Sequence, residues 1–149
     1  MWGTASERSG ASCARPGSLS AVSVDGVDIL VLRPLSVGDD LDAVTPALTS
    51  AFIAAREALG AGRSVAVVVD ARDLLGQGSP LDAAVATGLL GMVRALGIEG
   101  VKPGWSINVV AGGEGDEAAV EETVAMLVGS SLTGQLLQVG GANLGKVVP

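Results

Sequence analysis

The sequence predicts an α/β fold in which a parallel sheet of about four strands lies between layers of helices, and three observations predict it. Segments of strand character alternate along the chain with segments whose apolar residues recur at helical spacing. The segment 64–70, SVAVVVD, is a continuous and mostly β-branched run, as expected for a strand covered on both faces. The composition is 48% hydrophobic but only 2% aromatic, with 22 glycines, so Ala, Val and Leu must fill a closely packed core.

A chain of 149 residues fits one domain, and a domain of that length buries about 70% of the surface that its unfolded chain exposes. We assign this domain to residues 19–149. Residues 1–18 are rich in Ser, Gly, Arg and Pro and contain no apolar stretch of the kind found in secretory signals. They are predicted to form a flexible tail.

The first strand is predicted at 27–33, VDILVLR, and a helix follows it at 40–60. Pro46 lies near the start of this helix, where it fits either the first turn or a kink. The apolar residues of the helix recur at helical spacing and are Leu41, Val44, Leu48, Phe52 and Leu59.

A second helix is predicted at 80–99. Ser79 is a good N-cap, Pro80 suits the first helical position, and Asp82 complements the helix dipole from the first turn. Small residues occupy most of the remaining surface, so this helix can pack closely on more than one side. One apolar stripe runs along it and consists of Leu81, Val85, Leu89, Met92 and Leu96.

The rest of the domain continues the alternation, with strands at 105–111 and 135–140 and a helix at 116–128 between them. Right-handed crossovers between successive strands make the sheet parallel. At the other end, Asp25-Gly26 would allow a hairpin with an additional antiparallel edge strand at 20–24.

Composition excludes several classes of function. The net charge of −7, with nine scattered Lys and Arg, gives no basic surface for nucleic acid. The chain has no histidine and one cysteine, Cys13, which excludes disulfides, common zinc sites and imidazole-dependent catalysis, and which suits a reduced cytoplasm. Gly, Arg and Asp interrupt every apolar run before the roughly 18–20 residues that a membrane span needs, so we expect no membrane association.

Six stretches of the sequence occur together in a recognisable order. They are VDILV, SAFIAAREAL, GRSVAVVVD, LLGMVRALGIEG, SINVV and TGQLLQVGG, the last being the most specific. From residue 26 onward the chain thereby resembles the C-terminal half of a short-chain dehydrogenase/reductase, nearest to the 3-oxoacyl-carrier-protein reductase type. The resemblance implies a truncated Rossmann-like three-layer sandwich.

The resemblance also shows what this sequence does not retain. In that family, the phosphates of NAD(P) lie on a Gly-rich turn that opens a helix after the first strand. Nothing before residue 26 matches such a turn. The segment after Gly112-Gly113 is also shorter than the substrate loop of the family. We therefore expect that the chain binds no cofactor.

The family's chemistry requires a tyrosine, a lysine, a serine and an asparagine. Aligned to this sequence, the tyrosine falls on Leu81 and the lysine on Val85, while the serine falls near Val69 and the asparagine near Ala47. The chain contains no tyrosine at all, so no shift of the alignment restores the acid. The sequence therefore favours a protein without reductase activity.

Two polar groups could be interpreted as sites. Asp70, Arg72 and Asp73 follow a predicted strand, at the end where open α/β sheets place ligands; a solvated turn is the simpler interpretation. The acidic residues around Asp116 could be interpreted as a metal cluster, but an exposed helix face explains them better. Asn108 matches the pattern of the resembling family, in which this residue hydrogen-bonds local backbone, so the resemblance implies a structural role.

The leading hypothesis is a non-catalytic subunit that oligomerises, as a homodimer or as structural or regulatory partner of a full-length short-chain reductase. In the family the helices matching 40–60 and 80–99 meet across a dimer axis, and the last helix and strand form a second interface. The alternative hypothesis is residual binding of a nucleotide or acyl ligand at the Asp70–Asp73 turn. The suggested interface residues are Phe52, Leu81, Val85, Leu89, Met92, Leu96, Leu136 and Val139.

Overall fold

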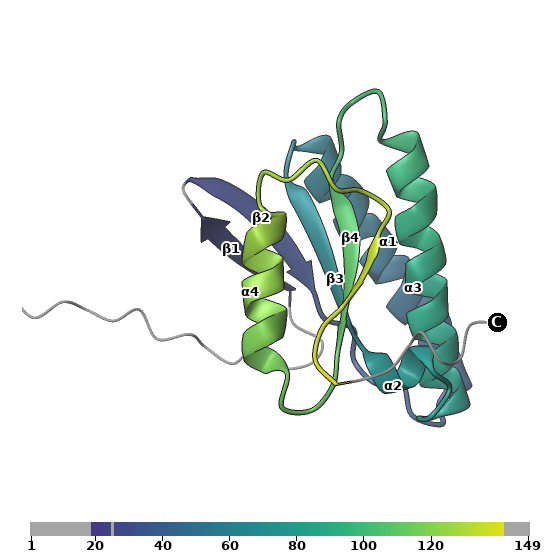
Figure 1. The fold of residues 1–149 in the computed structure, drawn as a ribbon. Coiled ribbons are helices and arrows are strands. Elements are labelled where there is room, and N and C mark those ends of the chain that lie inside the picture. The colour runs from purple at the N-terminus through teal and green to yellow at the C-terminus, as the bar shows by residue number, and fades with distance from the viewer. Residues whose placement is uncertain (1–18, 25, 142–149) are drawn as a thin grey trace, which may run out of the picture.

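The computed structural model describes residues 19–24 and 26–141 of the chain. Within them the chain folds into a three-layer α/β arrangement with one central sheet (Figure 1). The predicted fold class is therefore confirmed. The tail predicted at 1–18 lies outside the described residues.

The sheet has five strands that lie in the order in which they occur in the sequence. The strands are β1 (Leu19–Val24), β2 (Val27–Leu32), β3 (Ser64–Asp70), β4 (Ile107–Gly112) and β5 (Leu136–Gln138). β2 to β5 are parallel, and β1 runs antiparallel to β2. The additional edge strand is thus present, joined to β2 by a turn in which Gly26 has a φ of +80°.

The hairpin covers one edge of the parallel strands. β1 pairs with β2 along its whole length, from Leu19 opposite Leu32 to Val24 opposite Val27. The last strand is shorter than the predicted 135–140, because the chain turns at Gly140, whose φ is +78°. β5 therefore forms a short edge on the other side of the sheet.

One face of the sheet carries three helices. α1 (Val44–Gly60) follows a single 3₁₀ turn at Leu41–Ala43, and Pro46 lies in its first turn as predicted. α2 (Ala71–Leu74) is a one-turn helix where the sequence indicated a plain turn. α3 (Pro80–Glu99) begins after Ser79, whose side chain accepts a hydrogen bond from the Leu81 amide.

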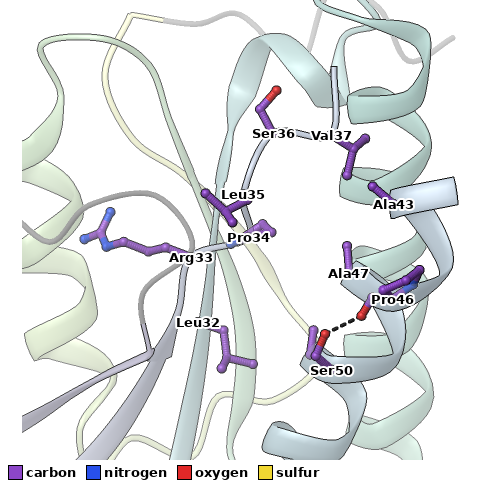
Figure 2. A pocket seen from close by; sticks show the side chains of 11 residues that line it. Leu32, Arg33, Pro34, Leu35, Ser36, Val37, Ala43, Pro46, Ala47 and Ser50 are labelled. Carbon is purple, nitrogen blue, oxygen red and sulfur yellow. Dashed lines mark hydrogen bonds between the residues drawn. The ribbon is translucent and has the colours of Figure 1, made fainter. Parts of the chain in front are cut away.

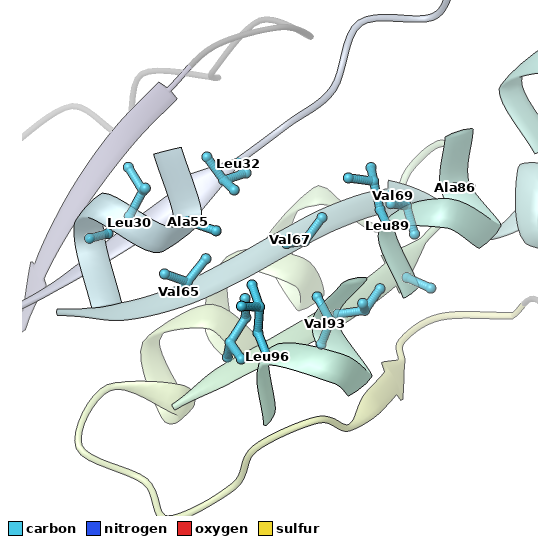
Figure 3. Packing of buried hydrophobic residues seen from close by; sticks show 14 of the residues in the cluster. Leu30, Leu32, Ala55, Val65, Val67, Val69, Ala86, Leu89, Val93 and Leu96 are labelled. Carbon is cyan, nitrogen blue, oxygen red and sulfur yellow. The ribbon is translucent and has the colours of Figure 1, made fainter. Parts of the chain in front are cut away.

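α4 (Glu117–Leu127) alone covers the opposite face, where it buries Val120, Val124 and Leu127 (Figure 1). The alternation of side chains along β3 divides the core between the two faces. Val65, Val67 and Val69 point towards α1 and α3 (Figure 3), whereas Ala66 and Val68 point towards α4.

α3 is unusually apolar. Within the described part of the chain, it is the one helix whose length and composition would suffice to cross a membrane, with a mean hydropathy of 1.5 in its most apolar window. This corrects the expectation that every apolar run is interrupted too early. Four of its large apolar residues are buried against the sheet, namely Val85, Leu89, Val93 and Leu96, and they account for part of this hydropathy.

Candidate functional site

The candidate site is a cavity of about 210 Å³ at the carboxyl ends of β2 and β3, beside the first turns of α3. Ligand sites of open α/β sheets occur at this end of the strands. Val68, Val69 and Val85 supply its apolar wall, and Asp70, Asp73 and Asp82 supply its charged groups. None of the residues that line it is basic.

Asp82 holds the loop between β2 and α1 in place. Its carboxylate accepts hydrogen bonds from Ser36 Oγ at 2.8 Å, from the Val37 amide at 2.7 Å and from the Gly38 amide at 3.3 Å. Ser79 adds a bond from its hydroxyl to the Gly38 carbonyl. The first turn of α3 therefore fixes one wall of the cavity, and the lone pairs of Asp82 are largely engaged.

Asp70 caps the one-turn helix α2, because its side chain accepts a hydrogen bond of 2.8 Å from the Arg72 amide. Partial burial raises the pKa of Asp73 above its ordinary value of 3.8, and the carboxylates of Asp70 and Asp82 raise that pKa further, against the opposing effect of Arg72. The site is thus an acidic cavity in which the carboxylates of Asp70 and Asp82 already accept hydrogen bonds from backbone amides.

The structure brings together two of the four positions at which the resembling family keeps its catalytic residues. Val69 and Val85 both line the cavity, and Leu81 lies half-buried one turn before Val85. Ala47 lies on α1 in a neighbouring cavity. Apolar side chains therefore occupy all four positions that the resemblance assigns to the family's catalytic residues.

A dinucleotide does not fit this set of residues. Its pyrophosphate needs backbone amides at a helix N-terminus or cationic side chains. The cavity instead presents three aspartates, and Asp82 already occupies the free amides of Val37 and Gly38.

A larger cavity of about 570 Å³ lies beside the first, between the end of β2 and the start of α1 (Figure 2). Its lining is mainly apolar and includes Leu32, Pro34, Val37 and Ala47. The Ser50 hydroxyl, which also lines it, donates to the Pro46 carbonyl. Arg33 also lines this cavity, and in Figure 2 its side chain points away from α1.

Comparison with known proteins agrees with this fold. No family model matches the sequence, and no curated protein matches it significantly. Among solved structures, one described as a crystal structure of a small-chain dehydrogenase superposes with a TM-score of 0.58 at 16% sequence identity. The match covers 76% of this chain and 67% of that chain. The likeness shows that the chain has a fold of the short-chain dehydrogenase kind.

Asn108 behaves as the sequence indicated. It is fully buried, its amide nitrogen donates to the Leu132 carbonyl at 2.8 Å, and its amide oxygen accepts from the Gln135 amide at 3.1 Å. It thereby attaches the segment before β5 to β4. Asp116 likewise serves the backbone, accepting from the Gly113 amide at 2.9 Å, and no group of residues suited to a metal ion occurs in the described part of the chain.

The suggested interface residues divide into two sets. Val85, Leu89 and Leu96 are no more than 3% exposed and pack under the sheet, which corrects their assignment to a partner surface. Leu81, Leu136 and Val139 are half-buried. Phe52, at 46% exposure, and the half-buried Met92 lie together in a groove of about 290 Å³ between α1 and α3.

The structure adds exposed apolar side chains that the sequence analysis did not single out. Ile53 on α1 is 51% exposed, and Ile98 near the end of α3 is 77% exposed. On α3 the small residues Ala84, Gly91 and Ala95 share this exposed side. The signal in the sequence is that α3 carries further apolar residues outside the stripe that faces the sheet. We call the surface of Phe52, Ile53, Met92 and Ile98 the helix face.

Proposed function

We propose that this chain is a degenerate relative of the C-terminal half of the short-chain reductase fold that acts in the cytoplasm by associating with another protein chain, without transferring hydride. The observation that carries the proposal is the helix face, where large apolar side chains of α1 and α3 remain in solvent. Phe52 and Met92 line one groove between these helices, and exposed apolar surface that gathers in this way is typical of protein interfaces.

The candidate site supports the same conclusion. Reduction of a carbonyl needs a proton donor beside the substrate and a cradle for the nicotinamide cofactor. The described site has Val69 and Val85 at its wall and an acidic lining, and the sequence contains no tyrosine. What the fold still offers is a rigid scaffold that presents its helices.

Two partners suit the helix face. One is a second copy of this chain, and the other is a full-length short-chain reductase, whose corresponding helices would offer a matching surface. Gly88 favours close helix packing, because a methyl group added there would lie 3.0 Å from a Leu48 methyl carbon. α1 and α3 therefore pack closely against each other and would contact a partner as one rigid surface.

The test uses the double variant Phe52→Glu with Met92→Glu. Two carboxylates in the groove between α1 and α3 would have to lose their water on association. We therefore expect the Kd of the complex to rise at least tenfold. Light scattering after gel filtration measures the mass, alone and with a reductase.

The matched control for this test is Met126→Glu, because Met126 on α4 is 57% exposed on the opposite side of the sheet. This control should leave the mass unchanged. An unaltered mass for the double variant, with wild type associated, would refute the helix face as the interface.

A second candidate function is binding of a small apolar or acyl ligand, and the cavity of about 570 Å³ next to the site favours it. Ligand pockets are commonly this large and mainly apolar. Calorimetric titration with a medium-chain acyl compound and with NADPH separates the candidates. Saturable heat with the acyl compound alone would support this function, whereas tight NADPH binding would overturn the non-catalytic proposal.

A further inference from the structure

The outer edge of the sheet is formed by β1. It pairs with β2 on one side, and no described strand pairs with its other side (Figure 1). The pairing with β2 runs through six successive residue pairs without a bulge, and the strand LSAVSV contains neither charge nor proline. Monomeric proteins usually protect such edges with lysine, proline, bulges or very short strands. β1 has none of these protections.

The hairpin register identifies which backbone groups are free. The pair that flanks a two-residue turn, here Val24 and Val27, exchanges both backbone hydrogen bonds, and such pairs alternate along the ladder. The amides and carbonyls of Val24, Val22 and Ser20 therefore face β2. Those of Leu19, Ala21 and Ser23 point away from the sheet and are spaced for a further antiparallel strand.

The edge is complementary to itself. A two-fold axis through Ala21 places Ala21 opposite Ala21 of a second copy and Leu19 opposite its Ser23, so all three outward residues find hydrogen-bonding partners. Ala21 and Ser23 are small, so the side chains fit without a clash. On the other side of the sheet, Val22, which is 36% exposed, lies opposite Ser20 of the second copy.

Charge selects this edge over the rest of the surface. The chain carries a net charge of −7, so most faces of two copies repel each other. Residues 19–24 are uncharged, and Asp28, which lies opposite Ser23 on β2, accepts a hydrogen bond from the Ser23 hydroxyl. The opposite edge offers much less, because β5 has three residues.

We propose that β1 pairs with β1 of a second copy, antiparallel and about Ala21, to form one continuous ten-stranded sheet across the two subunits. This interface does not depend on the proposed function, because it uses the sheet edge and leaves the helix face free. It is also distinct from the helix contacts that the resembling family suggests.

The first test is the variant Ala21→Pro, made in chains that carry Phe52→Glu and Met92→Glu so that the helix face does not contribute. The amide that Ala21→Pro removes points outward, so β1 keeps its bonds to β2, and proline is tolerated at such edge positions. We expect at least a tenfold weaker dimer than that of the parent double variant by sedimentation velocity, with an unchanged circular dichroism spectrum. Ala21→Val in the same chains retains the amide, favours the strand and should keep the dimer. An unchanged dimer with Ala21→Pro, or a monomeric parent double variant, overturns the proposal.

The second test fixes the register by disulfide trapping in chains that carry Cys13→Ser. Ser20→Cys in one chain and Val22→Cys in another would form a non-hydrogen-bonded pair about 4.5 Å apart between Cα atoms, within the range for a disulfide. We expect a cross-linked dimer when the two variants are mixed and oxidised, and little in either alone. No cross-link on mixing overturns this register.

Combination with the helix-face variant separates the two interfaces. Phe52→Glu with Met92→Glu should leave the cross-link between positions 20 and 22 intact, because Phe52 and Met92 lie on α1 and α3 and the cross-link lies on β1. Loss of the cross-link in that background would contradict an independent edge interface. Persistence of the cross-link with no mass change from the helix-face variant would refute the proposed function alone.

Discussion

At the scale of the residue, Asn108 is the polar side chain that the described core can least lose. Its amide supplies two hydrogen bonds to backbone groups of the segment before β5, in a position with no access to water. Asn108→Ala leaves the Gln135 amide without this acceptor and the Leu132 carbonyl with the Ser106 hydroxyl alone, and we expect it to cost about 2 kcal/mol of unfolding free energy. Urea unfolding measures this loss.

Ser106→Ala is the matched comparison for Asn108→Ala. The Ser106 hydroxyl donates to the same Leu132 carbonyl, at 2.9 Å, but in an exposed position. Its removal should cost less than about 1 kcal/mol, since water can replace an exposed partner. Equal losses for the two variants would show that burial does not set the importance of Asn108.

Asp73 gives a prediction about pH. Burial and the neighbouring carboxylates raise its pKa in the folded state above 3.8, so the folded chain holds this proton more tightly than the unfolded chain. The contribution of Asp73 to stability is therefore present below pH 3.8 and declines as pH rises through the raised pKa. Asp73→Asn should be more stable than wild type near neutral pH, and this advantage should shrink in acid.

Urea unfolding of both chains over a series of pH values measures the difference for Asp73→Asn. The sign is diagnostic, because a carboxylate held by cations would give the reverse trend. A gap between variant and wild type that widens towards acid pH would contradict the environment described for Asp73.

The same residues show what sequence could and could not predict about the site. The structural role of Asn108 was implied by the resemblance to a known family, and the apolar character of Val69 and Val85 is evident from the sequence itself. The role of Asp82 could not, because its partners at Ser36, Val37 and Gly38 lie more than forty positions away and meet it only after folding.

At the scale of the element, α3 packs against the segment before β5 through Gly97. A Cβ added there would lie 2.9 Å from the Gly134 Cα atom, which is backbone and cannot rotate away. We expect Gly97→Ala to destabilise the fold by about 1–3 kcal/mol. Gly60→Ala, at the end of α1 with open space around it, should be neutral or stabilising by up to about 1 kcal/mol.

Urea unfolding of Gly97→Ala and Gly60→Ala distinguishes close packing from helix propensity. If propensity dominated, both variants would gain stability. Such a gain for Gly97→Ala would contradict the close approach of α3 to Gly134.

Elements were predictable where local patterns decide them. The β-branched run of β3 and the capped start of α3 both occur where the sequence indicated. α2 was not expected, because four residues after Asp70 carry too little periodicity to reveal a helix. The stripe of α3 was recognised, but sequence could not tell that the sheet covers Val85, Leu89 and Leu96 while Met92 remains at the margin.

At the scale of the whole molecule, the chain has a fold of the short-chain dehydrogenase kind. Apolar residues occupy the positions that the resemblance assigns to catalytic side chains. Its sheet is completed by an antiparallel hairpin, and its helices leave an apolar face in solvent. Both features favour contact with further chains, and the acidic cavity disfavours a dinucleotide. Association with another chain is therefore the function that we propose for this protein.

The mass of the native protein in solution tests this central claim most directly. Sedimentation equilibrium of the purified chain, run over a wide range of concentration and again in the presence of a full-length short-chain reductase, would provide it. The account predicts a mass of two chains or more for the wild type, or a mixed complex with the reductase. A single-chain mass under every one of these conditions would contradict it.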